Sequence, residues 1–311
     1  YQILIVSIGL LWLLGFNGLL GFSLQRFVFP DSEDYALAAH DLFVNHSVHC
    51  YRALLMSFVN GLPYLFGSSD AAIYPWSFFV NVICWLGTAL IIFEITKDFI
   101  LPKYAFACSV ASFFIFGNAA LNYHLLTESL YTFWMLAGFY FVFRYYKTLQ
   151  FYWLSIALGF FLLSVLIKPG AQFLAIVFVL YFLREIAQNY KSKSMLFVWF
   201  GMLMIGVQLV GMKSKFGDYK ISYIDGVTYY NYLFARAEAY RDNSDYDEVK
   251  TKRANFILSQ SIPQQKEIAM ADFKQQVMHN TGNVFKAYCV NLIDNTKTGS
   301  DAIQKLKNIH N

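Results

Sequence analysis

The sequence predicts an all-α polytopic membrane protein with about seven transmembrane helices, an amphipathic juxtamembrane helix in its first outer loop and a C-terminal helical region outside the membrane. Hydrophobic residues make up 57% of the 311 residues and charged residues only 14%, which is far more apolar than a soluble globular protein. Charged residues become denser after Met212. We therefore expect a membrane module over 1–212 and an extracytoplasmic helical region over 213–311 that leads into further spans.

The spans are predicted from apolar runs of about 20 residues, or slightly fewer where neighbouring helices and bilayer thinning help. The first run is interpreted as a membrane helix and not as a removed signal peptide, because more spans follow it in place of a small-residue cleavage site. The predicted spans are 1–23, 76–95, 104–121, 128–146, 151–167, 171–188 and 195–212.

The orientation follows from where the basic residues stand. The connections after the second, fourth and sixth spans carry most of them, and the positive-inside rule assigns these connections to the cytoplasm. The loop 25–75, the junctions 124–128 and 168–170, and everything after residue 212 then share the outer face. The basic residues concerned are Lys97, Lys103, Arg144, Lys147, Arg184, Lys191 and Lys193.

An acidic segment follows the first span. Asp31 stands after Pro30 at the position of a helix N-cap, and Asp34 can complete a capping arrangement. Tyr35, Ala38 and Leu42 recur at helical spacing, which predicts a short amphipathic helix on the membrane surface. Two roles stay open for Asp31: it caps this helix, or it acts as a general base that takes a proton from a hydroxyl group.

Charged residues at other membrane edges also have two interpretations. Arg52, before an apolar interfacial segment, and Lys168, at the end of the fifth span, either hold a phosphate or extend towards the lipid headgroups. Glu128 opens the fourth span, where it either favours the helix start or belongs to a site.

Several functional classes find no support. Net charge is +4 without a basic cluster, so we expect no nucleic-acid partner. No cofactor is expected either, because the spacing of His40, His46, His49 and His124 matches no metal motif. A divalent ion held by these histidines with Asp31 and Asp34 stays a minor alternative.

Four segments resemble the GT-C superfamily of polytopic glycosyltransferases, in particular the branch of protein O-mannosyltransferases and lipid A aminoarabinose transferases. The resemblance covers about the first 170 residues. Ser32, Arg52-Ala53-Leu54 and Lys168-Pro169 depart from it, since many relatives have Glu, Arg-Pro-Pro-like and Arg-Pro sequences there. The segments are Pro30-Asp31-Ser32 with Tyr35 and Ala38-Ala39, Tyr51-Arg52 with the stretch ending in Leu65-Phe66-Gly67, Leu126-Thr127-Glu128-Ser129-Leu130-Tyr131, and Ile167-Lys168-Pro169.

The resemblance implies a membrane enzyme that moves a sugar from a polyprenyl-phosphate donor to a hydroxyl of a glycan, lipid or protein acceptor, with inversion and without a metal. The active site would face the outside of a bacterial cytoplasmic membrane. Asp31 would be the general base, with Asp34 and Glu128 as further catalytic candidates. The residues implied for substrate and lipid-phosphate binding are Arg52, Lys168, Tyr35 and His124.

Two other classes remain as alternatives. A transporter or flippase would have polar or broken positions near the middle of its spans. Only residues such as Asn17, Asn81 and Gln208 fall there, and such residues commonly bond neighbouring helices. A non-catalytic membrane scaffold would use the region after Lys213 for docking, and it predicts that Asp31 is dispensable.

Overall fold

The structure is a computed structural model that describes residues 1–20 and 30–307, and every regular element in these ranges is helical. The α-helices are α1 Gln2–Leu20, α2 Pro30–Phe43, α3 Leu54–Gly61, α4 Ile73–Thr96, α5 Pro102–Ala111, α6 Phe116–Leu121, α7 Glu128–Thr148, α8 Phe151–Ser164, α9 Gln172–Tyr181, α10 Leu183–Asn189, α11 Leu196–Phe216, α12 Ile224–Thr228, α13 Ala235–Asp242, α14 Tyr246–Leu258, α15 Ile262–His279 and α16 Thr281–Lys307. Short 3-10 turns and one π-helix, Tyr229–Phe234, join them.

Fewer helices than predicted are long and apolar enough to cross a membrane. In the described part of the chain three pass by length and composition, Gln2–Leu19, Asp70–Thr96 and Lys193–Phe216. Pro169–Tyr181 and Leu183–Asn189, bent by 63°, make a fourth if they act as one span. The predicted count of seven is therefore not confirmed. The predicted span 104–121 consists of α5 and α6 with a 3-10 turn between them, and α8 has only 14 residues.

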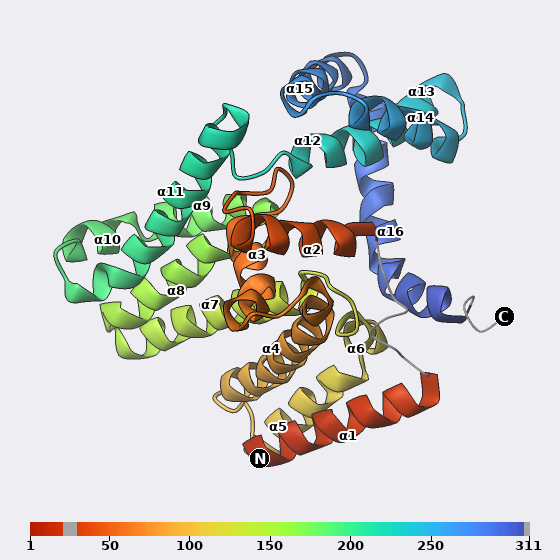
Figure 1. The fold of residues 1–311 in the computed structure, drawn as a ribbon. Helices are drawn as coiled ribbons and strands as arrows, with labels where there is room; N and C mark the ends of the chain where they lie inside the picture. The colour runs from red at the N-terminus through yellow and green to blue at the C-terminus, as the bar shows by residue number, and fades with distance from the viewer. Residues whose placement is uncertain (21–29, 308–311) are drawn as a thin grey trace.

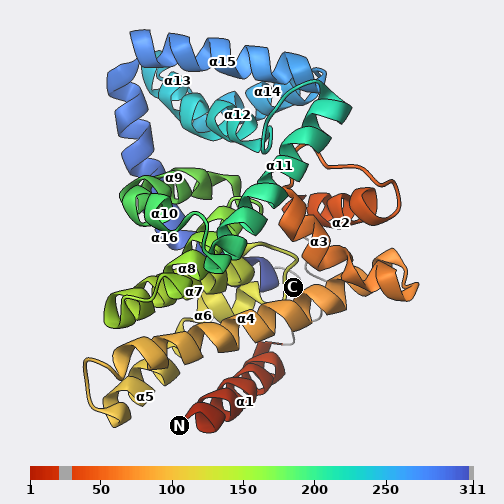
Figure 2. The same cartoon turned by 90° about the vertical axis from the view of Figure 1, so that its left-hand side faces the viewer.

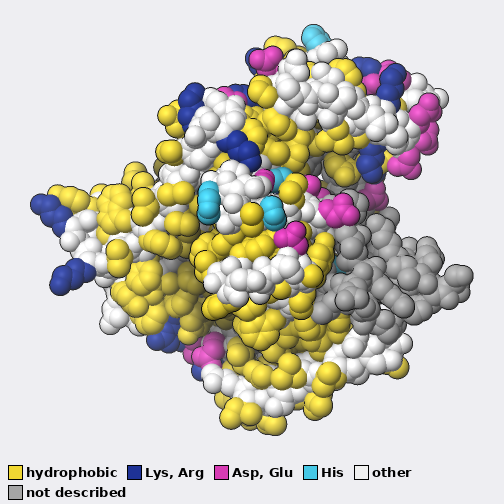
Figure 3. All heavy atoms as spheres, viewed as in Figure 1, with side chains coloured by type: hydrophobic (Ala, Val, Ile, Leu, Met, Phe, Trp, Pro, Cys, Tyr) yellow, Lys and Arg dark blue, Asp and Glu magenta, His cyan; other side chains and the backbone are white. Residues whose placement is uncertain are grey.

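The long helices pack side by side. Helix α4 contacts α1, α5 and α7, and α8 lies between α7 and α11 (Figures 1 and 2). Small residues permit close approach between such helices: a Cβ atom on Gly159 of α8 would lie 3.0 Å from the backbone oxygen of Phe197 in α11. Hydrophobic side chains cover much of the outer surface of this bundle, and charged ones gather on the C-terminal helices (Figure 3).

Polar contacts show which helix ends lie together. The Gln2 side-chain amide donates to Glu94 at 2.8 Å, and Lys147 pairs with Asp98 at 2.6 Å. The start of α1 and the ends of α4 and α7 therefore share one end of the bundle. This arrangement agrees with the predicted common side of the connections after the second and fourth spans.

The predicted amphipathic helix is α2, and it packs against α3. It begins at Pro30, so Asp31 is its second residue and lies inside the first turn, two positions after the N-cap position; the predicted N-cap role of Asp31 is therefore wrong. The apolar segment after Arg52 forms α3 and a 3-10 turn, Leu62–Phe66, which ends at Gly67 with a φ of 72°. The backbone N–H groups of Leu55 and Met56 donate to the carbonyl of Leu166, at 3.0 and 3.2 Å, and thereby attach α3 to the end of α8.

The C-terminal helices form a separate layer at the top of Figure 1. Helix α16 descends from this layer to contact α6. Arg253 of α14 is buried at the centre of the layer, where it pairs with Glu238 and Asp272 and lies 3.8 Å from the ring centroid of Tyr230. These helices confirm the predicted helical region after residue 212.

Candidate functional site

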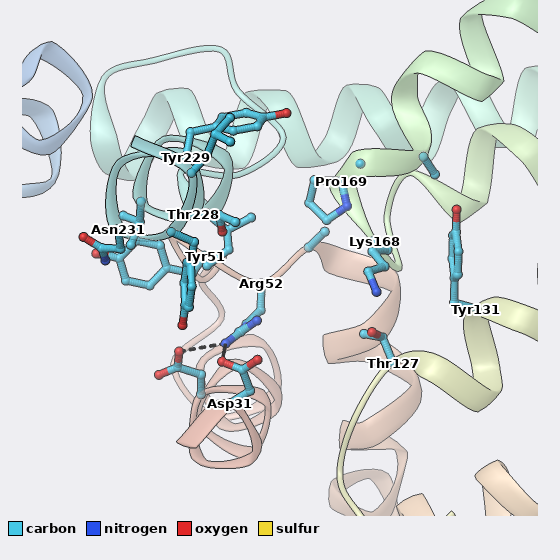
Figure 4. A pocket seen from close by; sticks show the side chains of 18 of the residues that line it. Asp31, Tyr51, Arg52, Thr127, Tyr131, Lys168, Pro169, Thr228, Tyr229 and Asn231 are labelled. Atoms are coloured by element: carbon cyan, nitrogen blue, oxygen red, sulfur yellow. Dashed lines mark hydrogen bonds and ion pairs between the residues drawn. The ribbon is translucent and has the colours of Figure 1, made fainter. Parts of the chain in front are cut away.

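A cavity of about 930 Å³ lies between the first part of the chain and the C-terminal layer. Its lining includes six of the seven predicted site residues: Asp31, Asp34 and Tyr35 from α2, Arg52 from the loop before α3, Glu128 from the start of α7, and Lys168 from the turn before α9. Figure 4 shows Arg52 and Asp31 on one side of this space and Lys168 on the other. The fold thus brings together residues that are up to 137 positions apart (168 − 31).

Arg52 is the centre of one group of charges. Its Nη2 atom donates to Asp31 Oδ1 at 2.8 Å and to Asp34 Oδ2 at 3.0 Å (Figure 4). The arginine side chain is only 6% exposed, whereas those of Asp31 and Asp34 are 62% and 41% exposed. Burial alone would lower the pKa of the Arg52 guanidinium, but Tyr35 and the two carboxylates outweigh it and raise the pKa. Arg52 therefore stays charged and orients both carboxylates.

Tyr35 links this group to α7. Arg52 Nη1 donates to the Tyr35 hydroxyl at 3.2 Å, and the guanidinium carbon lies 4.3 Å from the centroid of the tyrosine ring. The same hydroxyl bonds the side chain of Thr127, which directly precedes Glu128. Burial raises the pKa of Tyr35 against the opposing effects of Arg52 and of the hydrogen bond from Thr127, so the hydroxyl keeps its proton.

The loop that carries Arg52 is fixed by neighbours from α11 and from the segment that follows it. The Ser222 hydroxyl donates to the carbonyl of Tyr51 at 2.7 Å, and the Tyr223 N–H donates to the carbonyl of Cys50 at 2.9 Å. The N–H of Leu54 donates to the Gln208 side chain of α11 at 3.1 Å. The segment after α11 thus holds the arginine loop against α2.

Lys168 and Glu128 form a second group. Lys168 Nζ lies 3.4 Å from Glu128 Oε1 and 5.7 Å from the ring centroid of Tyr131. The lysine side chain is about half exposed. Glu128 Oε2 is buried and accepts no hydrogen bond from the described residues. A ligand in the cavity would therefore meet an accessible ammonium group, whereas Glu128 Oε2 is closed off from the open space.

His124, the seventh predicted residue, does not line the cavity. It is buried, and its backbone carbonyl accepts a hydrogen bond of 2.9 Å from the Asn81 side chain of α4. Its position therefore suits contact between α4 and the segment before α7. Across residues 1–20 and 30–307, no group of three or more His, Cys, Asp and Glu side chains is placed to hold a metal ion.

The C-terminal layer supplies a wall that the sequence reasoning did not identify. The π-helix contributes Tyr229, Asn231 and Tyr232, and α16 contributes Tyr288 and Asn291. Burial, together with the negative charge of Asp31, raises the pKa of Tyr232, so this hydroxyl stays protonated close to α2. π-Helical turns frequently occur at functional sites, but their wider hydrogen bonding leaves no simple sequence pattern.

The cavity combines three carboxylates and two cations with aromatic rings and amide groups. Comparison with protein-family models, with curated protein sequences and with solved structures found no match for this chain. The chemistry of the cavity must therefore be inferred from its own residues. An oriented carboxylate can accept a proton, an accessible ammonium can offset an anion, and the rings and amides provide surfaces for a polyhydroxy ligand.

Proposed function

We propose that the protein is a membrane glycosyltransferase that moves a sugar from a polyprenyl-phosphate donor to the hydroxyl group of an acceptor. The single observation that carries this proposal is the convergence of Asp31, Arg52, Glu128 and Lys168 on one cavity. These residues come from four separate segments of the sequence. The proposal places the cavity on the outer face of a bacterial cytoplasmic membrane.

In this proposal Asp31 is the general base. Its Oδ1 atom is held by Arg52, while the side chain is 62% exposed and so can reach a substrate in the cavity. A base must lie within hydrogen-bond reach of the proton that it takes, and a fixed orientation raises its efficiency. Arg52 then acts through Asp31 and Asp34, because its two terminal nitrogens already bond these carboxylates and Tyr35.

Lys168 supplies the charge for the donor phosphate. Its ammonium group is about half exposed and is held by Glu128 at the long distance of 3.4 Å, so a phosphate oxygen can compete for it. Glu128 would place the ammonium group through its Oε1 atom.

The proposed reaction is a direct displacement. Asp31 takes the proton of the acceptor hydroxyl while that oxygen attacks the anomeric carbon of the donor sugar. The bond from this carbon to the phosphate oxygen breaks, and polyprenyl phosphate leaves with the bonding electron pair. Attack from the side opposite the phosphate inverts the anomeric centre, and Lys168 stabilises the charge that develops on the leaving group.

The test is transfer of labelled sugars from polyprenyl-phosphate donors by the purified full chain in lipid nanodiscs. Asp31→Asn keeps an oxygen that can accept from Arg52 but removes the base, so we expect the rate to fall by about a hundredfold or more. Glu33→Gln is the matched control, because Glu33 lies exposed in the same helical turn. It should keep the parent rate.

Two results would oppose the proposal. If Asp31→Asn transfers sugar at the parent rate, Asp31 is not the base, and its role is to hold Arg52 and α2 in place. Failure of the parent to use any of the donors offered would favour the transporter or the scaffold alternative. Flux measurements in proteoliposomes would then test the transporter, and partner capture from membranes would test the scaffold.

A further inference from the structure

His49 occupies a central place in the loop that carries Arg52. It is 7% exposed and lies three residues before the arginine. Its Nδ1 atom accepts hydrogen bonds from the backbone N–H groups of Tyr51 and Arg52, each at 3.2 Å. A nitrogen that accepts hydrogen bonds carries no proton, so the ring is neutral with its proton on Nε2.

These two hydrogen bonds determine where the Arg52 side chain begins. Two successive N–H groups that point at one acceptor fold the backbone into a tight turn around the imidazole ring. The guanidinium then reaches Asp31, Asp34 and Tyr35 at distances between 2.8 and 3.2 Å. The other polar contacts of the loop do not satisfy the two N–H groups that His49 holds. They use the N–H of Leu54, the hydroxyls of Ser47 and Tyr51, and the carbonyls of Val48, Cys50 and Tyr51.

The charges around His49 come from α2, from its own loop and from α11. Burial lowers the pKa of His49 below its ordinary value of 6.5; Asp34 and Asp41 oppose this shift, while Arg52 and Lys215 add to it. Lys215 also bonds the loop directly, since it donates to Ser47 Oγ and to the Val48 carbonyl at 3.0 Å each. The ring is therefore neutral at neutral pH, and acid converts its acceptor nitrogen into a donor.

We propose that His49 is a positioning residue of the site, whose neutral ring fixes the turn that carries Arg52 and thereby the orientation of Asp31. The site is complete only while this ring is neutral. The catalytic part of this inference rests on the proposed glycosyl transfer, whereas the part that concerns the turn does not.

The sign of the pH effect follows from proton binding. Between the lowered pKa in the folded protein and 6.5, the unfolded chain binds the proton more tightly than the folded chain. The contribution of His49 to stability is therefore fully present above about pH 6.5, and it is lost as the pH falls through this window.

Three variants of the full chain test the proposal. His49→Asn places an amide oxygen near the position of Nδ1 but does not titrate, and His49→Phe keeps a ring without an acceptor. His46→Asn is the control, because His46 lies exposed in the same loop with a φ of 49°, a conformation that asparagine adopts readily. Thermal unfolding between pH 5 and 7.5 and the pH profile of sugar transfer are measured for each.

We expect His49→Phe to lower Tm at pH 7.5 and to lower kcat by about tenfold, the effect of losing one or two positioning hydrogen bonds. KM for the donor should change little, because Lys168 lies outside this turn. His49→Asn should restore both values at pH 7.5. Between pH 7.5 and 5 it should lose at least about 2 °C less of its Tm than the parent, and His46→Asn should follow the parent.

The outcomes separate the two proposals. If the parent transfers no sugar, the proposed function fails while the Tm measurements still decide the role of His49. The positioning role is overturned if His49→Asn is as impaired as His49→Phe at pH 7.5, or if parent and His49→Asn show the same dependence of Tm on pH. It is also overturned if His49→Phe matches the parent in Tm and kcat.

Discussion

A single nitrogen of Arg52 bonds two carboxylates that stand three residues apart on α2. On a helix such residues are neighbours, so the negative charges of Asp31 and Asp34 would repel each other without the guanidinium. The arginine is buried while the carboxylates are largely hydrated. Water therefore screens these ion pairs, and their main effect is orientation and not stability.

This asymmetry predicts the effect of Arg52→Lys. Lysine keeps the charge, but its single ammonium group lacks the planar fork that serves Tyr35 and the two carboxylates together. We expect the free energy of unfolding to fall by only about 1 kcal/mol, because the carboxylates stay hydrated. Sugar transfer should fall by at least about tenfold, since Asp31 loses its fixed orientation.

The matched control for Arg52→Lys is Arg241→Lys. Arg241 binds the adjacent Asp242 through two hydrogen bonds of 2.7 Å, but both residues are exposed on the C-terminal layer. Its replacement should change neither thermal unfolding nor transfer. Equal rates for Arg52→Lys and the parent would show that orientation by the guanidinium is not needed.

At the scale of elements, α2 carries the two carboxylates of the charged group, and α3 directly follows the loop that carries Arg52. The two helices pack through a close contact. A Cβ atom on Gly61 would lie 2.3 Å from a ring carbon of Phe43. Phe43 also lies against Phe58 and Tyr64, with ring centroids 5.8 and 6.0 Å apart. The missing side chain of Gly61 therefore sets how closely the end of α2 approaches α3.

We predict that Gly61→Ala displaces Phe43 and destabilises the protein by about 1–3 kcal/mol, the usual cost of overpacking. The shift should also move the first turn of α2 relative to Arg52 and reduce transfer. Thermal unfolding and the transfer rate measure both effects. Gly15→Ala in α1 is the control, because a Cβ atom there meets nothing within 4 Å. If the two variants behave alike, the contact with Phe43 does not fix this helix pair.

The helices also show which boundaries can be predicted from local sequence patterns. The acidic start and helical spacing after Pro30 predicted α2, because both signals are local, although the helix begins two residues before the start that an N-cap at Asp31 implies. The predicted span 104–121 is interrupted, since hydropathy counts apolar side chains without detecting where the backbone leaves the helix. The break lies at Ile115, whose ψ of 88° is not helical.

At the scale of the whole molecule, the cavity is completed by contacts that no local pattern encodes. The Tyr51 hydroxyl donates to Gln265 at 2.6 Å, across 214 positions of the sequence. The predicted membrane orientation placed the residues after 212 on the same face as Asp31. The resemblance to the GT-C superfamily supplied the order of the charged residues along the chain. Neither specified that the π-helix would line the same cavity as α2, because that arrangement depends on how the C-terminal layer folds.

Arg253 joins three helical elements of that layer. It is 8% exposed, its Nε donates to the carbonyl of Tyr230 within the π-helix at 2.9 Å, and it also pairs with Glu238 and Asp272. Its loss would leave two partly buried carboxylates without their cation, which commonly costs about 3–5 kcal/mol. The π-helix would lose a backbone partner at the same time.

We therefore predict that Arg253→Met loosens the cavity wall while the membrane helices keep their packing. Hydrogen exchange in residues 229–234 should become faster, exchange in α4 and α7 should stay as in the parent, and transfer should fall because Asn231 and Tyr232 no longer hold their places. Lys252→Met is the control, since Lys252 is exposed on the same helix. Unchanged exchange in the π-helix would contradict this role for Arg253. Normal transfer despite faster exchange would instead show that the reaction does not need an ordered π-helix. The charged groups of α2 and α7, with Arg52 and Lys168, would then be sufficient for the reaction.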